Sequence, residues 1–285
     1  MTAISAKPAA NAGAFQTIPS IIAIVLSGVF VFLVYYLAKI NIIPGDNLPL
    51  YALLGVILGA ALIAFGVHFV PVGGAPAAMG QSPGIATGVA MLATGAGLAG
   101  LFGGAWASEH GIWVALGSGA IGGGLMMAIT CLMVNISYVY GMGIPPASGK
   151  VEKDPITGDS QEEYKSQGTE GHGLPFVSYV GGVIGGILGG LGGTLIYLQL
   201  YEFYENTFKP IYSVSDNITQ MSVGLAGMFA IGMFLVISVL SAYNITGTIE
   251  GPHDPKFKRF PRAIIAAILA SSVCGFIAIM VGASF

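Results

Sequence analysis

The sequence predicts an all-α fold: a polytopic membrane helix bundle with six to seven transmembrane helices and glycine-rich packing faces. Only 8% of the 285 residues are charged, 54% are hydrophobic, and the mean hydropathy is +0.81. Soluble domains carry about 25% charged residues, so this composition excludes an ordinary soluble core. The net charge of −3 is too small to indicate a nucleic-acid partner.

Charged residues are absent from seven apolar stretches, each close to the roughly 20 residues that a membrane helix needs. All 10 basic and 13 acidic residues lie in the connections or at the termini. This segregation is the strongest indication of a membrane protein. The stretches are Ile18–Leu37, Leu48–Val70, Ile85–Gly104, Ile112–Tyr140, Phe176–Leu200, Met221–Tyr243 and Ala263–Phe285.

The first stretch is too long for the core of a signal peptide, and Lys7 is the only basic side chain before it. We therefore expect it to remain, so that residues 1–45 form an N-terminal extension with an additional membrane span. Residues 46–285 then form the multi-span membrane domain. The third stretch, which is small and only mildly apolar, is expected to be either a full span or a re-entrant element covered by other helices.

Basic residues predict the orientation. The connections at about residues 141–175 and 244–262 carry seven of them, and two spans separate these connections, so both lie on one side of the membrane. The positive-inside rule makes that side cytoplasmic. The connection from Tyr201 to Gln220 has one lysine and three acidic residues, which suits the outer face. With seven spans the N-terminus lies inside.

The fifth stretch has eight glycines among the thirteen residues from Gly181 to Gly193. A glycine costs about 0.8–1 kcal/mol relative to alanine in a soluble helix, but a membrane-embedded backbone must satisfy its own hydrogen bonds and stays helical. The glycines then allow close helix approach, which we expect within the chain and against partner subunits; packing within the chain alone is the alternative. The helix-packing lane consists of Gly181, Gly185, Gly189 and Gly193, beside a second lane of Gly182, Gly186 and Gly190.

Polar groups at membrane depth are few. Within the spans, Asn135 is the only deep carboxamide, and scattered hydroxyls such as that of Thr130 accompany it. Two interpretations of Asn135 stay open: an ion-path ligand and a hydrogen bond to a neighbouring helix. His68, in "VHFVPVGGAPAAMG" at the end of the second stretch, is either a proton or ion group or a capped interface residue.

The two cytoplasmic connections offer docking surfaces rather than chemistry. One holds a mixed charge run, and the other is basic and suited to lipid headgroups. No nucleophile–base arrangement, no phosphate-binding glycine loop and no metal-ligand spacing is evident, so we expect no catalytic residue and no metal site in this chain. The docking candidates are Glu170, His172, Glu250, His253 and Asp254.

Four long motifs carry a resemblance to a known family. They are "VHFVPVGGAPAAMG", "GIPPASGKVEKDPITGDSQEEY", "SQGTEGHGLPFVSYVGGVIGG" and "YNITGTIEGPHDPKFKRFP". They resemble the D subunit of the membrane-bound tetrahydromethanopterin S-methyltransferase of methane-forming archaea. The resemblance runs from about Leu48 to the C-terminus, so the first 45 or so residues go beyond the family pattern.

The resemblance implies a subunit of a complex that transfers a methyl group from methyl-tetrahydromethanopterin to coenzyme M and exports sodium ions. It implies that a corrinoid is held by the A subunit, that the C and E subunits are the membrane partners, and that the E subunit supplies the ion-path carboxylate. This chain then binds no cofactor alone and, with the lipid around it, forms scaffold and ion-path wall, with sodium at a shared site.

The residues agree with that division, because no span contains an acid and a bare cation needs a compensating charge. We expect Asn135, Thr130 and His68 to contribute neutral groups to a sodium path. Two other classes of function remain: a self-sufficient secondary transporter of a small solute, with its site near Pro71 and Pro76, and a purely structural membrane protein.

Overall fold

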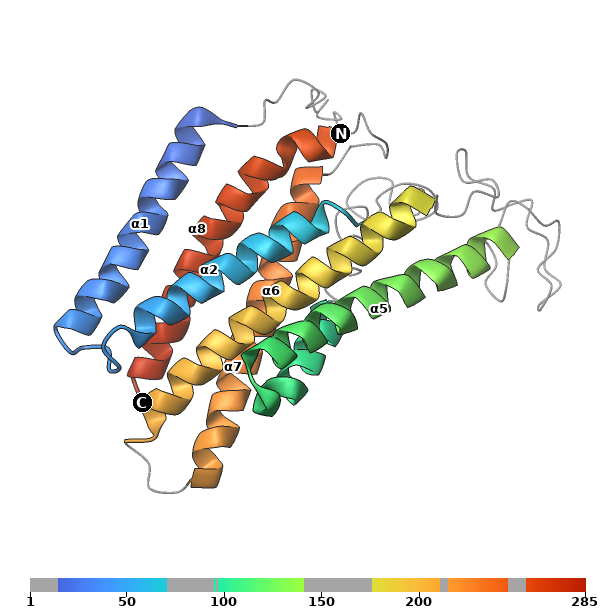
Figure 1. Cartoon of the computed structure of the whole chain (residues 1–285). Coiled ribbons are helices and arrows are strands. Elements are labelled where there is room, and N and C mark those ends of the chain that lie inside the picture. The colour runs from blue at the N-terminus through green and yellow to red at the C-terminus, as the bar shows by residue number, and fades with distance from the viewer. Residues whose placement is uncertain (1–14, 71–94, 96, 141–175, 211–214, 246–254) are drawn as a thin grey trace, which may run out of the picture.

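The computed structural model describes residues 15–70, 95, 97–140, 176–210, 215–245 and 255–285, and these contain helices and no strand (Figure 1). Six helices of the described part are long and apolar enough to cross a membrane. This confirms the predicted all-α bundle. The helices are α1 (Thr17–Lys39), α2 (Leu48–Val67), α5 (Ile112–Tyr140), α6 (Phe176–Phe208), α7 (Ser215–Ile245) and α8 (Pro255–Ala283), with a short 3₁₀ helix η2 (Ala107–His110).

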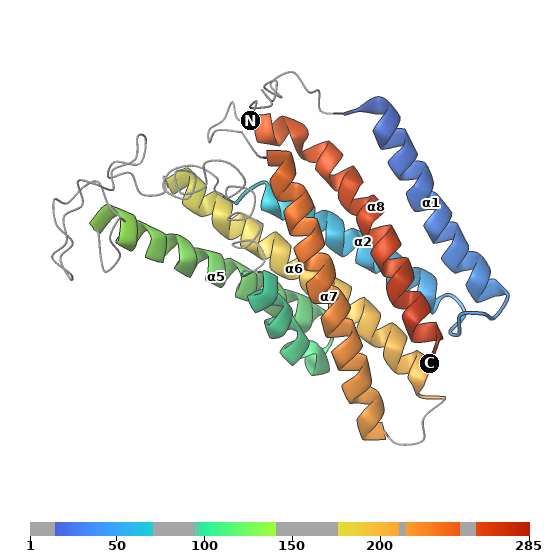
Figure 2. The same cartoon turned by 180° about the vertical axis from the view of Figure 1, so that it is seen from behind.

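Helix α6 forms the centre of the bundle. It contacts α2 and α5 most extensively and also touches α7 and α8. Figures 1 and 2 show α6 between α2 and α5, and α7 crosses behind α6 in Figure 1 and in front of it in Figure 2. More than half of its membrane window is buried inside the chain, whereas α1 is buried over only 22% of its window. The predicted glycine-rich stretch is therefore an interior helix.

The α2–α6 contact is built on glycines seven residues apart. An added Cβ at Gly59 would lie 2.6 Å from the carbonyl oxygen of Gly192, and one at Gly66 would lie 2.8 Å from the carbonyl oxygen of Gly185. Real side chains do not approach this closely, so only glycine fits at these places. A seven-residue repeat keeps its side chains on one seam of two helices that wrap around each other.

The α5–α6 contact uses a different spacing. Gly119 lies against Gly190, and Gly123 lies against Gly186, so that each helix offers two glycines four residues apart. This is the small-xxx-small arrangement by which membrane helices bring their backbones together. Tyr179 adds a hydrogen bond from its hydroxyl to the carbonyl of Ala128, at 2.9 Å.

Residues 97–106 form a helical piece that precedes η2 and fits between α5, α6 and α7. The hydroxyl of Thr194 donates to the carbonyl of Gly100 at 3.2 Å, and Ser118 donates to the carbonyl of Gly103 at 3.0 Å. Gly97 lies against the ring of Phe234. This piece is the end of the third apolar stretch. Residues 85–94 lie outside the described residues, so the stretch can still be either a full span or a re-entrant element.

Several helices extend further than the apolar stretches. Helix α6 continues to Phe208 and α7 begins at Ser215, so most of the expected outer connection from Tyr201 to Gln220 is helical. Phe203, Tyr204 and Phe208 are fully buried there, and the Tyr204 hydroxyl donates to the carbonyl of Ala278 in α8 at 2.9 Å. The charged residues of this segment predicted a connection. Its buried aromatic side chains instead pack into the bundle, so most of the segment is helical.

The connection predicted at about residues 244–262 is also shorter than expected, whereas the one at about 141–175 keeps its predicted bounds. Helix α7 runs to Ile245, and α8 begins at Pro255, where a proline at the first helical position needs no hydrogen-bond acceptor. The end of α5, the start of α6, the end of α7 and the start of α8 lie at one end of the bundle in both views (Figures 1 and 2). The two connections predicted to be cytoplasmic therefore leave the bundle at the same end.

Candidate functional site

A partly buried polar network joins α2, α7 and α8 at that end of the bundle. His68, directly after α2, is fully buried, and its Nδ1 lies 2.7 Å from the carbonyl oxygen of Ala64. Its Nε2 lies 3.0 Å from Nδ2 of Asn244 in α7. Arg262 in α8 donates from Nε to Oδ1 of Asn244 at 2.6 Å. Three helices are thus joined through one asparagine.

Hydrogen-bond chemistry fixes the direction of this chain of contacts. The carbonyl of Ala64 only accepts, so Nδ1 of His68 carries the hydrogen. The guanidinium of Arg262 only donates, so the oxygen of Asn244 faces Arg262 and its NH₂ group faces His68. Nε2 of His68 therefore accepts, and the imidazole is the neutral Nδ1–H tautomer. Its basic nitrogen is engaged by Asn244.

Aromatic rings lie beside the histidine of the network. The ring of Phe260 lies 6.4 Å from the imidazole of His68 and 5.3 Å from the ring of Phe65. Apolar surroundings strengthen hydrogen bonds and make their loss more costly. The network is therefore a polar clamp at a helix junction.

Helix α7 carries further buried polar side chains before Asn244. Ser238 and Ser241 are fully buried, and they lie one to two turns before Asn244 on the same helix. Neither of their hydroxyl oxygens has a hydrogen-bond partner among the described residues, and the same holds for Ser222. Buried hydroxyls of this kind are neutral oxygen groups that can accept a water molecule or contribute to a cation site.

Thr130 lies on a different surface. Its hydroxyl donates to the carbonyl of Met126 one turn earlier, at 2.8 Å. The neighbouring side chains of Met126, Ile129 and Met133 are exposed, so this side of α5 faces out of the chain. An ion site that uses Thr130 would have to be completed by another molecule.

The remaining predicted residues divide between described and undescribed parts. Asn135 belongs to α5, but its side chain lies outside what the structure describes. The docking candidates Glu170, His172, Glu250, His253 and Asp254 lie outside the described residues. Among the described residues, no group of three or more His, Cys, Asp or Glu side chains is placed to hold a metal ion.

The four glycines of the predicted lane do not share one neighbour. Gly181 lies against the carbonyl oxygen of Phe69, and Gly185 lies against that of Gly66, both after or within α2. Gly189 and Gly193 instead meet the ring of Phe234 in α7. Positions four residues apart advance by about 40° around a helix of 3.6 residues per turn, so the lane turns from one neighbour to the next.

Sequence reasoning missed Asn244 and Arg262 as partners of His68. Both were placed in a connection, because the apolar stretches end at Tyr243 and restart at Ala263. One signal was available: Asn244 follows Ser241 by three residues and therefore extends the same side of a helix. Nothing in the local sequence shows that His68 would meet them.

Comparison with known proteins places most of the chain in one family. The family model for the D subunit of tetrahydromethanopterin S-methyltransferase matches residues 49–271. Relatives of that name are 50% identical over 228 residues in Methanosarcina mazei, covering 79% of this chain and 91% of the relative, and 42% identical over 229 residues in Methanocaldococcus jannaschii, covering 78% and 93%. In Methanopyrus kandleri the identity is 48% over 221 residues, covering 78% and 92%. Helix α1 lies before the matched region.

Proposed function

Because the chain belongs to the family of the D subunit of tetrahydromethanopterin S-methyltransferase, we propose that it is the membrane scaffold and the ion-path wall of that complex. The complex transfers a methyl group from methyl-tetrahydromethanopterin to coenzyme M through a corrinoid on its A subunit and exports sodium ions. The C and E subunits are the proposed membrane partners. The observation that carries the proposal is the family match over residues 49–271.

The scaffold role is supported by the glycine contacts. Helix α6 meets α2 and α5 at backbone distance, and such contacts fix helix positions tightly because little side chain intervenes. Many large apolar side chains of α1, α5 and α7 are exposed on the outside of this bundle. A rigid interior with an apolar exterior suits a subunit that other membrane helices surround.

The wall role is supported by the chemistry of the polar groups. No apolar stretch contains an acidic residue, so a cation inside this chain would meet only neutral oxygens. The buried hydroxyls of Ser222, Ser238 and Ser241 and the outward-facing Thr130 are such groups. Placing a cation among neutral groups in a membrane is costly, so the compensating carboxylate is proposed to come from a partner.

Purification from cells in mild detergent tests the scaffold role. We expect the tagged chain to bring down several other subunits together with a cobamide absorbance. A chain that purifies alone and takes up a solute after reconstitution into liposomes would instead establish the secondary transporter.

Sodium transport by the reconstituted complex tests the wall role. Asn135→Leu and Thr130→Val are expected to leave corrinoid content and assembly intact and to lower sodium uptake per methyl group transferred. Ser213→Ala, in the connection between α6 and α7, is a control that removes a hydroxyl elsewhere. Coupling that survives both Asn135→Leu and Thr130→Val would remove these residues from the path.

A further inference from the structure

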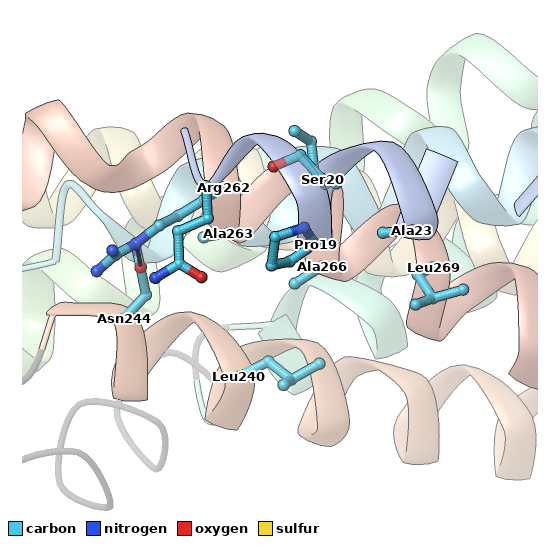
Figure 3. A pocket seen from close by; sticks show the side chains of 11 residues that line it. Pro19, Ser20, Ala23, Leu240, Asn244, Arg262, Ala263, Ala266 and Leu269 are labelled. Carbon is cyan, nitrogen blue, oxygen red and sulfur yellow. Dashed lines mark hydrogen bonds between the residues drawn. The ribbon is translucent and has the colours of Figure 1, made fainter. Parts of the chain in front are cut away.

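A groove of about 590 Å³ lies between α1, α7 and α8 (Figure 3). Pockets that bind small molecules have volumes of about 300–1,000 Å³, so the groove is large enough for part of a lipid. Helix α8 contributes its floor, and α1 and α7 contribute its walls. Its polar lining residues are Gln16, Ser20, Asn244 and Arg262.

The two ends of the groove differ in polarity. Figure 3 shows Arg262 and Asn244 together at one end and Ala23 and Leu269 at the other. Gln16 and Ser20, at the start of α1, belong to the lining, whereas the part along α8 beyond Arg262 is made of Ala, Ile and Leu side chains. A molecule that fits must be polar at one end and apolar along the rest.

The polar end lies where the membrane spans begin. Arg262 is the third residue of the candidate span that starts at Phe260, and Ser20 is the fourth residue of the span that starts at Thr17. Arginine at such a position reaches toward the headgroup layer while its stem lies against apolar surface. Ala266 and Leu269 lie one and two turns deeper.

We propose that this groove binds one anionic phospholipid, with its phosphate at Arg262 and one hydrocarbon chain along Ala266 and Leu269. A guanidinium presents its N–H donors in a rigid fork that matches phosphate oxygens. The 2.6 Å bond from Nε of Arg262 to Asn244 holds that fork at the end of the groove. Charge complementarity thus selects an anionic headgroup, and the apolar floor selects a chain.

The site depends on the extension that precedes the family match. Gln16, Pro19, Ser20 and Ala23, in or next to α1, form one wall, while the matched region begins at residue 49. Helix α1 packs mainly on α8 and α2 and leaves much of its surface exposed. A lipid in the groove adds contact between α1 and α7, so binding stabilises the attachment of the extension.

Native mass spectrometry of the purified complex tests the proposal. After delipidation, the complex is incubated with phosphatidylglycerol or with phosphatidylcholine that has the same chains. We expect one phosphatidylglycerol to be retained per copy of this chain, in preference to phosphatidylcholine. Arg262→Gln removes a charge-assisted contact and is expected to weaken retention about tenfold or more.

Ala266→Phe keeps Arg262 and fills the groove, so it is expected to abolish retention even if Arg262→Gln disturbs folding. Lys209→Gln is the matched control, because Lys209 is an exposed cation after α6, at the opposite end of the bundle. Retention that is unchanged in Ala266→Phe, or equal for the two lipids, would overturn the proposal. So would a disulfide crosslink from Ala266→Cys to a cysteine of another polypeptide, which would show that a protein helix fills the groove.

Discussion

Helices α6 and α7 both contain several glycines, but their glycines have opposite surroundings. On α6, Gly185, Gly186 and Gly190 lie against the backbones of α2 and α5 so closely that a Cβ would collide. On α7, an added Cβ at Gly224, Gly227 or Gly232 has no neighbour within 4 Å among the described residues outside its own turn of helix. The first set holds the helices together, and the second set lies open in the part of the chain that the structure describes.

The difference shows that glycine content alone does not locate a helix interface. Membrane helices gain little from the hydrophobic effect when they associate, so close backbone approach and packing must supply the stability. Where two glycines from different helices meet, that approach is achieved within the chain. Where a glycine meets none of the described helices, its surface is open to a close approach from outside them.

The largest effect is expected at the α5–α6 contact. Gly186→Leu would place four carbon atoms where the carbonyl oxygen of Gly123 and the side chain of Met127 already lie. Overpacking of this size costs about 3 kcal/mol or more, because neither backbone can move aside cheaply. We expect little folded protein by size-exclusion chromatography in detergent. Gly232→Leu, on the open side of α7, is the matched control and should elute normally.

A polar contact on the inner side of α7 is expected to rank second. Asn244→Leu removes the two hydrogen bonds that join His68 and Arg262 through Asn244. Loss of two partly buried hydrogen bonds, one of them to a charged group, costs about 2–3 kcal/mol. Thermal unfolding in detergent should show a clearly lower midpoint. Asn206→Leu removes an exposed hydrogen bond within α6 and should leave the midpoint unchanged. Equal midpoints for the two variants would contradict a stabilising role of the Asn244 network.

Two alanine substitutions within α6 sharpen the comparison further. A Cβ at Gly185 meets the carbonyl oxygen of Gly66 at 2.5 Å, whereas a Cβ at Gly189 meets the ring of Phe234 at an ordinary 3.5 Å. Gly185→Ala is therefore expected to cost about 1–2 kcal/mol, and Gly189→Ala is expected to be neutral or slightly stabilising. Denaturant unfolding midpoints of the two variants test this difference. An equal loss of stability in both variants would show that Gly185 and Gly189 are packed equally tightly.

The smallest effect is expected on the outside of α7. Gly232→Ala adds a methyl group in open space and improves helix propensity, so the isolated chain should gain at most about 1 kcal/mol. Gly232→Leu tests what covers this surface in the complex. If partner helices approach there, the variant chain will fold normally and yet migrate without its partners on a native gel. Normal assembly would show that this side of α7 faces lipid.

The sequence by itself determined that the chain is a helical membrane bundle, because apolar stretches of spanning length that exclude every charge have no other stable arrangement. The sequence also indicated close packing along α6, and its long motifs indicated the family to which the chain belongs. The tertiary structure alone decided which neighbour each glycine meets: a lane drawn at a spacing of four advances by about 40° per step, so Gly185 faces α2 and Gly189 faces Phe234. It also decided that His68 meets Asn244, 176 residues away in sequence, because local periodicity specifies the side of a helix and not the residue that packs against it.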